Sequence, residues 1–245
     1  MDDYTQRLNR FFETFRFPAE SDGIGTLGEK KLHAALKRFY AEDASCMEIP
    51  MGRFVADVFD GRRVVEIQTS QFARLLPKLR FFLERYPVTV VHPMPRTRYI
   101  TWTDPETGES SKPRKSPVVA TPFTAFHQLY QIRSLLGVEN LTVELLLFDI
   151  DEYRLLDGYG KFRKKGATLT ERIPRGEPEL IRLQTPADYR ALLPQDLPEE
   201  FTVPQLARLL GLRGRAAYSA IHVLEELGIT RECGRCGRAA LYRLT

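Results

Sequence analysis

The apolar positions of the first hundred residues switch repeatedly between helical and strand spacing. Apolar side chains recur at intervals of three and four in residues 26–40 and 71–85, a spacing that predicts two helices. Residues 48–69 carry two apolar runs around Asp60 and Gly61, which is typical of two strands joined by a two-residue turn. Alternation of helices with strands predicts a mixed α/β fold in which helices flank a sheet.

The remaining pattern extends this alternation and then weakens. A short amphipathic helix is expected near the N-terminus, in residues 2–17. Beyond residue 87 we expect, in order, a strand at 88–93 that ends at a proline, a strand at 96–102, a turn at 104–109, a mobile loop at 110–117, a helix at 121–136 and a buried strand at 141–153. Residues 151–200 have no strong pattern and are interpreted as a connector.

Two acids and an amide interrupt the apolar strands of residues 48–69. With a turn at Asp60 and Gly61, strand alternation puts Asp57, Glu66 and Gln68 on one face. The opposite face is apolar and consists of Ala56, Val58, Val65 and Ile67. Ionised carboxylates in a half-buried site need compensation. Hard divalent cations such as Mg²⁺ or Mn²⁺ provide it, and so does a basic side chain, of which Arg53, Arg62 and Lys78 are candidates.

At this point the sequence resembles the PD-(D/E)XK nuclease family. Asp57 is followed on the next strand by Glu66-Ile67-Gln68, and the preceding helix carries Glu29. The resemblance implies a restriction-endonuclease-like core in which Asp57, Glu66 and Glu29 bind catalytic Mg²⁺ or Mn²⁺, with the carbonyl of Ile67 as a further ligand. It also implies that Gln68 orients the attacking water, although the family usually has lysine there. Lys78, on the following helix, is a candidate for the missing charge.

Residues 201–245 form a second pattern of two helices and a hairpin. Thr202 and Gln205 have the spacing of a capping box, and a hairpin is expected to turn near Gly234 and Arg235. A small apolar core is expected from Leu206, Leu209, Leu210, Ala217, Ile221, Leu224, Ile229 and Leu241. This order resembles a winged helix-turn-helix domain, which implies binding of duplex DNA. The alternative is a protein-binding or dimerising module.

The residues expected to contact DNA lie on the second helix and on the wing. In winged helices the polar face of this helix enters the major groove, and the wing meets the flanking backbone. By that resemblance the DNA-binding residues are Arg213, Arg215, Tyr218, Ser219, His222, Arg231, Arg235 and Arg238. A basic cluster of Lys161, Arg163, Lys164 and Lys165 is either a set of phosphate contacts or a solvated surface.

Composition is consistent with a soluble cytoplasmic protein. The chain has 245 residues, 43% of them hydrophobic, which is sufficient for a core. The net charge is +4, and residues 201–245 account for all of it, with seven Arg, three Glu and no Lys or Asp. No membrane span or secretory signal is expected. Three cysteines argue against a disulfide framework, and Cys233 with Cys236 lacks the second ligand pair of a structural zinc site.

The sequence therefore predicts an accessory helix in residues 1–20, a nuclease-like domain in 21–150, a basic connector in 151–200 and a winged helix in 201–245. The predicted function is metal-dependent hydrolysis of phosphodiester bonds in double-stranded DNA, with a homodimer as a possible assembly. The alternative is a catalytically inactive DNA-binding or regulatory protein with the same fold. A third interpretation is a component of a toxin-like or mobile-element nuclease that needs a partner subunit.

Overall fold

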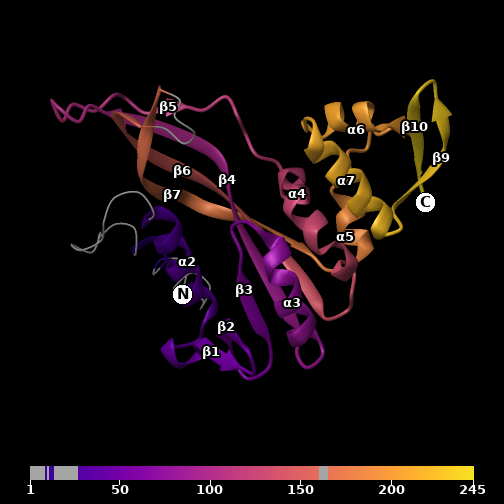
Figure 1. The fold of residues 1–245 in the computed structure, drawn as a ribbon, viewed down its shortest axis with the longest axis horizontal. Coiled ribbons are helices and arrows are strands. Elements are labelled where there is room, and N and C mark those ends of the chain that lie inside the picture. Colours follow the sequence, from indigo (N-terminus) through magenta and orange to yellow (C-terminus); the bar gives the residue numbers. More distant parts are fainter. Residues whose placement is uncertain (1–8, 10, 14–26, 160–164) are drawn as a thin grey trace. The chain divides into compact units, whose positions relative to one another are not determined.

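The computed structural model describes residues 9, 11–13, 27–159 and 165–245 (Figure 1). The first described elements follow the predicted order of helix, three strands, helix and strand. They are α2 (Leu27–Tyr40), a 3₁₀ turn (Ala44–Cys46), β1 (Met47–Met51), β2 (Phe54–Phe59), β3 (Val64–Ile67), α3 (Phe72–Leu83) and β4 (Val88–Thr103). The two expected helices are thus present, since their apolar residues face the core at helical spacing: Ala35, Leu36 and Tyr40 in α2, and Phe72, Leu75, Leu79 and Phe82 in α3.

The described strands form a mixed sheet of seven, with strand order β1-β2-β3-β4-β6-β7 and β5 paired to β4. β1 pairs with β2 antiparallel, whereas β3 pairs with β4 in parallel, with Val64 opposite Val88 and Ile67 opposite Val91. All four residues of β3 are buried. A strand buried on both faces is expected where parallel strands are joined through a helix, here α3.

The connection between β2 and β3 differs from the expected tight turn. β2 ends at Phe59 and β3 begins at Val64, so residues 60–63 lie outside the strands. Gly61 has a φ of +84°, but Asp60 is not among the residues with positive φ. A type I′ turn requires positive φ at both central residues, so the two-residue hairpin prediction was wrong.

Prolines did not end β4 where the sequence suggested. The strand continues through Pro93 and Pro95 to Thr103, and its far part pairs with β5 (Arg114–Lys115). Proline fits extended backbone and lacks only the N–H donor. The segment 110–117, expected as a mobile loop, therefore contains a short strand, while the predicted turn at 104–109 is present with an Asp104 N–H to Glu109 carbonyl bond of 2.9 Å.

The segment 121–136 is not one helix. It divides into a 3₁₀ helix η2 (Pro122–Ala125), one turn of α4 (Phe126–Leu129) and a 3₁₀ helix η3 (Tyr130–Leu135). Ile132 leaves helical geometry, with φ of −118° and ψ of 15°. Its buried apolar residues, including Phe123, Phe126 and Leu129, nevertheless face the core as predicted.

Strands β6 (Leu141–Tyr159) and β7 (Lys165–Leu183) are 19 residues each. β6 contains the expected buried strand but runs nine residues beyond the expected domain boundary at residue 150. Much of 151–200 therefore belongs to the sheet instead of forming a connector, and a short helix α5 (Pro186–Ala191) follows.

The chain divides into two compact units that are both discontinuous in sequence. The first unit comprises residues 1–60, 93–119 and 147–179, and the second comprises 61–92, 120–146 and 180–245. The division passes through β4, β6 and β7. The C-terminal residues thus share a unit with α3, η2, α4 and η3.

The C-terminal elements are β8 (Glu200–Thr202), α6 (Val203–Leu209), α7 (Arg215–Glu226), β9 (Thr230–Cys236) and β10 (Ala239–Leu244), with sheet order β8-β10-β9. The capping box of Thr202 and Gln205 is confirmed. The hairpin turns after Cys236, and not at Gly234 and Arg235, which lie in β9. Of the predicted core, Leu206, Leu210, Ala217, Ile221, Leu224 and Ile229 are buried.

Two predicted core residues are in other environments. Leu209 is 36% exposed, and Leu241 is only half buried. Phe201 and Tyr242 close this end of the core instead, with ring centroids 6.5 Å apart. Among the described residues, no helix is long and apolar enough to cross a membrane.

Candidate functional site

Glu66 is one of three buried glutamates in the described strands of the sheet, with Glu144 and Glu152, and it is only 2% exposed. It lies on β3 in the second unit. The Nζ atom of Lys78, on α3, is 2.5 Å from Oε2 of Glu66, and the Lys78 side chain is 20% exposed. The ammonium also lies 5.8 Å from the centre of the Phe82 ring. The helix that follows β3 therefore brings a lysine to the buried acid, one of the two forms of compensation that the sequence left open.

Side chains from the segment 122–135 cap the helix that carries Lys78. Gln71, which precedes α3, has left-handed backbone values, φ of 57° and ψ of 46°. The first N–H groups of a helix lack partners within the helix. The Ala73 N–H donates to Oε1 of Gln131 at 2.7 Å, and the Phe72 N–H donates to Oε1 of Gln128 at 3.5 Å. The start of α3 is thus held by α4 and η3.

Gln68 follows Glu66 and Ile67 at the end of β3. Its amide Nε2 donates to the carbonyl of Ser70, and Nδ1 of His92 lies 2.7 Å from the carbonyl of Gln68. His92 is buried and packs edge-on against Phe72, with ring centroids 5.1 Å apart. Burial lowers the pKa of His92, while the bond to Gln68 acts in the opposite direction. A neutral His92 that donates through Nδ1 therefore fixes the backbone at Gln68.

Asp57 lies on β2 in the first unit, with its side chain 14% exposed. Nε2 of His33, on α2, is 3.4 Å from Oδ2 of Asp57. Glu29 is four residues before His33 on the same helix, so the two share a helix face, although the Glu29 side chain lies outside the described part. His33 was not predicted from the sequence, and its spacing of four residues from Glu29 was the signal that could have identified it.

The predicted hairpin site is thus distributed over the two units. The second unit brings together Glu66, Ile67 and Gln68 with Lys78 and His92, and the first unit brings Asp57 to His33 and the helix of Glu29. Among the described residues, no group of three or more His, Cys, Asp or Glu side chains is placed to hold a metal ion. The donors available to a metal are the hard carboxylate and carbonyl oxygens that suit Mg²⁺ and Mn²⁺.

Helix α7 presents only part of its predicted DNA-binding face. Arg213, Arg215 and Tyr218 are exposed, with Tyr218 at 58%. Ser219 is buried at 7% exposure, and its hydroxyl lies 3.3 Å from Nδ1 of His127. The expectation that Ser219 belongs to an open polar face was wrong, because α7 packs against α4 and η3 within the second unit (Figure 1).

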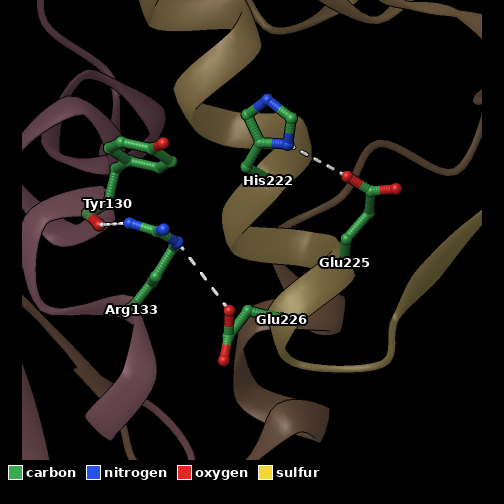
Figure 2. A pocket seen from close by; sticks show the side chains of 5 residues that line it. All are labelled: Tyr130, Arg133, His222, Glu225 and Glu226. Atoms are coloured by element: carbon green, nitrogen blue, oxygen red, sulfur yellow. Dashed lines mark hydrogen bonds and ion pairs between the residues drawn. The ribbon is translucent and has the colours of Figure 1, made fainter.

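A pocket of about 570 Å³ lies where α7 meets η3 (Figure 2). It is lined by Tyr130, Arg133, His222, Glu225 and Glu226. Arg133 lies 4.2 Å from the centre of the Tyr130 ring, and its Nε is 3.8 Å from the Glu226 carboxylate. His222 pairs with Glu225 at 3.1 Å, and its ring centroid is 5.9 Å from that of Tyr130. The predicted DNA contact His222 thus borders a pocket of mixed charge.

The wing carries its predicted arginines on the surface. Arg231, Arg235 and Arg238 are all exposed. Sγ of Cys233 donates to the Leu241 carbonyl at 3.4 Å, and both Cys233 and Cys236 are free thiols. Lys161, Arg163 and Lys164 lie outside the described residues, and Lys165 is described only as the first residue of β7.

Comparison with known proteins places the folded elements in a sequence family. The model of DUF8091, a domain of unknown function, matches residues 30–184, more than half of the chain. The chain belongs to this family. The DUF8091 match begins within α2 and ends just after β7, so it contains the whole seven-stranded sheet. An uncharacterized protein of Treponema pallidum (strain Nichols) is 29% identical over 228 residues, which cover 90% of this DUF8091 chain and 87% of that protein. No solved structure gave a significant match.

Proposed function

We propose that this protein is a divalent-metal-dependent nuclease that acts on double-stranded DNA. The observation that carries the proposal is the pairing of buried Glu66 with Lys78. The motif that the sequence resembles needs an acid and a lysine together, and the chain has Gln68 in the motif's lysine position. A lysine from α3 restores that combination from a different element. The order α2, β1, β2, β3, α3, β4, with β3 parallel to β4, supports a restriction-endonuclease-like core.

The proposed metal ligands are Asp57, Glu66 and the carbonyl of Ile67, with Glu29 holding the metal or one of its waters. They follow from the sequence resemblance, and their oxygen chemistry fits Mg²⁺ or Mn²⁺. A bound metal ion would lower the pKa of a water and offset charge on the phosphate. Lys78 supplies a fixed positive charge beside Glu66. Gln68 has its amide nitrogen bonded to Ser70, and its Oε1 would accept a hydrogen bond from the attacking water and so orient it.

The C-terminal residues are proposed to bind the duplex as a winged helix. The arrangement of β8, α6, α7, β9 and β10 supports this assignment. Arg215 and Tyr218 are exposed in the first turn of α7, and Arg213 is exposed just before it. Guanidinium groups read guanine or contact phosphates. Because Ser219 is buried against His127, the proposed contact surface consists of the first turn of α7 and the wing arginines Arg231, Arg235 and Arg238, with His222 at its edge.

The same ion pair also favours a second candidate function. An ammonium 2.5 Å from a buried carboxylate compensates that carboxylate without any metal ion. On this basis the alternative is a DNA-binding or regulatory protein that keeps the fold and has lost hydrolysis. The two candidates differ in whether Lys78 and Glu66 are needed for a reaction or only for stability.

Nicking of supercoiled plasmid in Mg²⁺, in Mn²⁺ and in EDTA tests the proposal. We expect cleavage only with metal, and a loss of roughly 100-fold or more in Glu66→Gln and Asp57→Asn, because each removes a carboxylate proposed to bind the metal ion. Lys78→Arg should keep more activity than Lys78→Met. Lys37→Met is a matched control, since Lys37, on α2, pairs with the exposed Glu48 of β1. The Lys37→Met variant should cleave DNA normally. DNA binding without cleavage in any metal would support the non-catalytic candidate instead.

A further inference from the structure

A second basic surface lies in the first unit, on the sheet formed by β4, β5, β6 and β7. Its centre is Glu152, a residue of β6 that is 0% exposed. The carboxylate of Glu152 binds two arginines through different oxygens. Arg154 donates to Oε1 from Nε at 2.7 Å, and its Nη2 forms an ion pair with the same oxygen at 2.6 Å. Arg172 donates to Oε2 from Nε at 3.1 Å.

Two arginines around one carboxylate leave a net positive charge that is held in place. One arginine would neutralise Glu152, so the second is not required to compensate its burial. Arg154 and Arg172 remain 28% and 36% exposed. Among the described residues, the two Nη groups of Arg172 have no partner. Because guanidinium forks bind phosphate oxygens in a bidentate manner, these free donors are suited to a phosphate.

Trp102 and Arg114 extend this surface. The guanidinium of Arg154 lies 5.6 Å from the centre of the Trp102 ring, on β4. Arg114, on β5, pairs with Ile100, which is two residues before Trp102. Strand alternation therefore puts Arg114 on the face of Trp102, and its exposed side chain has no partner within the described part of the chain.

We propose that the surface of Trp102, Arg114, Glu152, Arg154 and Arg172 binds the phosphate backbone of duplex DNA, independently of the winged helix. The occupant is duplex DNA and not an unpaired base, because Arg154 covers the Trp102 ring and leaves no open stacking platform of the type that single strands use. The choice of DNA over another polyanion rests on the proposed function. The surface would add sequence-independent affinity through phosphate contacts made by the first unit alone.

The opposite face of the same strands provides a matched control. Lys115 pairs with Tyr99, and Arg175 lies 4.5 Å from the centre of the Tyr99 ring. Tyr99 and Trp102 are three residues apart, so they point to opposite faces. Replacing Lys115 and Arg175 removes the same formal charge as replacing Arg114 and Arg172, but from the other face. Arg172→Gln leaves the pair of Arg154 with Glu152 intact, which keeps the buried acid compensated.

The test combines tryptophan emission with the salt dependence of binding. Trp102 is the single tryptophan of the chain, so a change in emission on titration with a short DNA duplex reports on this surface. Each phosphate contact contributes about 0.9 to the slope of log affinity against log salt concentration. We expect Arg114→Gln with Arg172→Gln to lower this slope by about 2 relative to the wild-type full chain. Lys115→Gln with Arg175→Gln should leave it unchanged.

Several outcomes would overturn the assignment. These are no binding of the duplex, an unchanged slope in the Arg114 and Arg172 double variant, or the same loss in the control variant. Polyglutamate can also be used in place of DNA as a probe. If it bound as tightly as the duplex, and if its salt slope fell equally in the Arg114 and Arg172 double variant, the surface would be a general polyanion site and not a DNA site. If the variants show the expected salt slopes but the protein does not cleave DNA, the result counts against the nuclease and not against this surface. If the protein cleaves DNA but the slope of the Arg114 and Arg172 double variant is unchanged, the result counts against the surface alone.

Discussion

Replacement of Lys78 by methionine should destabilise the protein in a manner that depends on pH. Methionine keeps the length and the apolar stem of lysine, so the change mainly removes the ammonium that lies 2.5 Å from buried Glu66. Removing one partner of a buried pair costs about 3 to 5 kcal/mol because the other charge remains buried. Water reaches this pair in part, since the Lys78 side chain is 20% exposed, which favours the lower end of that range.

Protonation sets an upper limit on the penalty. A buried carboxylate that loses its partner can take up a proton, and for a glutamate of ordinary pKa this costs about 4 kcal/mol at pH 7 and about 1 kcal/mol at pH 5. Lys78→Met should therefore lose about 3 kcal/mol of unfolding free energy at pH 7 and about 1 kcal/mol at pH 5, relative to wild type at the same pH. The double variant with Glu66→Gln should recover most of the loss at pH 7, because no buried charge remains.

Urea denaturation followed by far-ultraviolet circular dichroism at the two pH values measures these differences. Lys37→Met is the control, because Glu48, the partner of Lys37, is exposed and surface pairs contribute about 0 to 1 kcal/mol. A loss below about 1 kcal/mol at pH 7 would refute the reasoning. An equal loss at both pH values would also refute it, since the cost would then come from packing and not from charge.

Three other perturbations test neighbouring features. Gly137→Ala should lower the free energy of unfolding by about 2 kcal/mol and Gly108→Ala by about 1 kcal/mol, because both glycines have positive φ. The larger loss is expected at Gly137, where the added carbon would lie 3.1 Å from a leucine side chain. Thermal or urea unfolding measures both. Gln131→Ala should cost about 1 kcal/mol, since it removes the acceptor of the Ala73 N–H at the start of α3; hydrogen exchange that is unchanged in the first turn of α3 would contradict this. The pKa of His92 is lowered by burial, so the unfolded state binds a proton at higher pH than the folded state; stability should be fully present above the ordinary histidine pKa and fall as the pH drops below it. His92→Gln should show a shallower fall between pH 7 and pH 5 in the same assay, and parallel profiles would exclude His92 as the cause.

Local pattern predicted the elements whose formation depends on apolar spacing. α2 and α3 appear where residues 26–40 and 71–85 repeat at helical intervals, because burial of one face determines their position. The capping box at Thr202 was predictable for a similar reason, since its partners are three residues apart. The boundaries at prolines were less predictable. β4 passes through Pro93 and Pro95, and whether a strand tolerates a proline depends on which neighbour needs the missing N–H.

In the candidate site, too, features that depend on nearby residues could be predicted, whereas features that depend on residues far away in the chain could not. Ser219 is buried where α7 packs on α4, beside His127, which is 92 residues away in the chain, and no spacing on α7 reveals this burial. Lys78 could be named in advance because the helix after β3 is close in sequence, but its choice of Glu66 as partner required the fold. The arginines around Glu152 were not identified from the sequence, since Arg154 and Arg172 come from different strands that appeared to belong to a connector.

Strands shared between the two units make this chain hard to divide. The backbone passes from one unit to the other five times, between residues 60 and 61, 92 and 93, 119 and 120, 146 and 147, and 179 and 180. No single continuous fragment contains either unit whole, so an isolated half of the chain would lack part of each unit. After a single protease cut in the exposed turn of residues 104–109, the two fragments should stay associated. They should migrate as one species in size-exclusion chromatography until denaturant separates them.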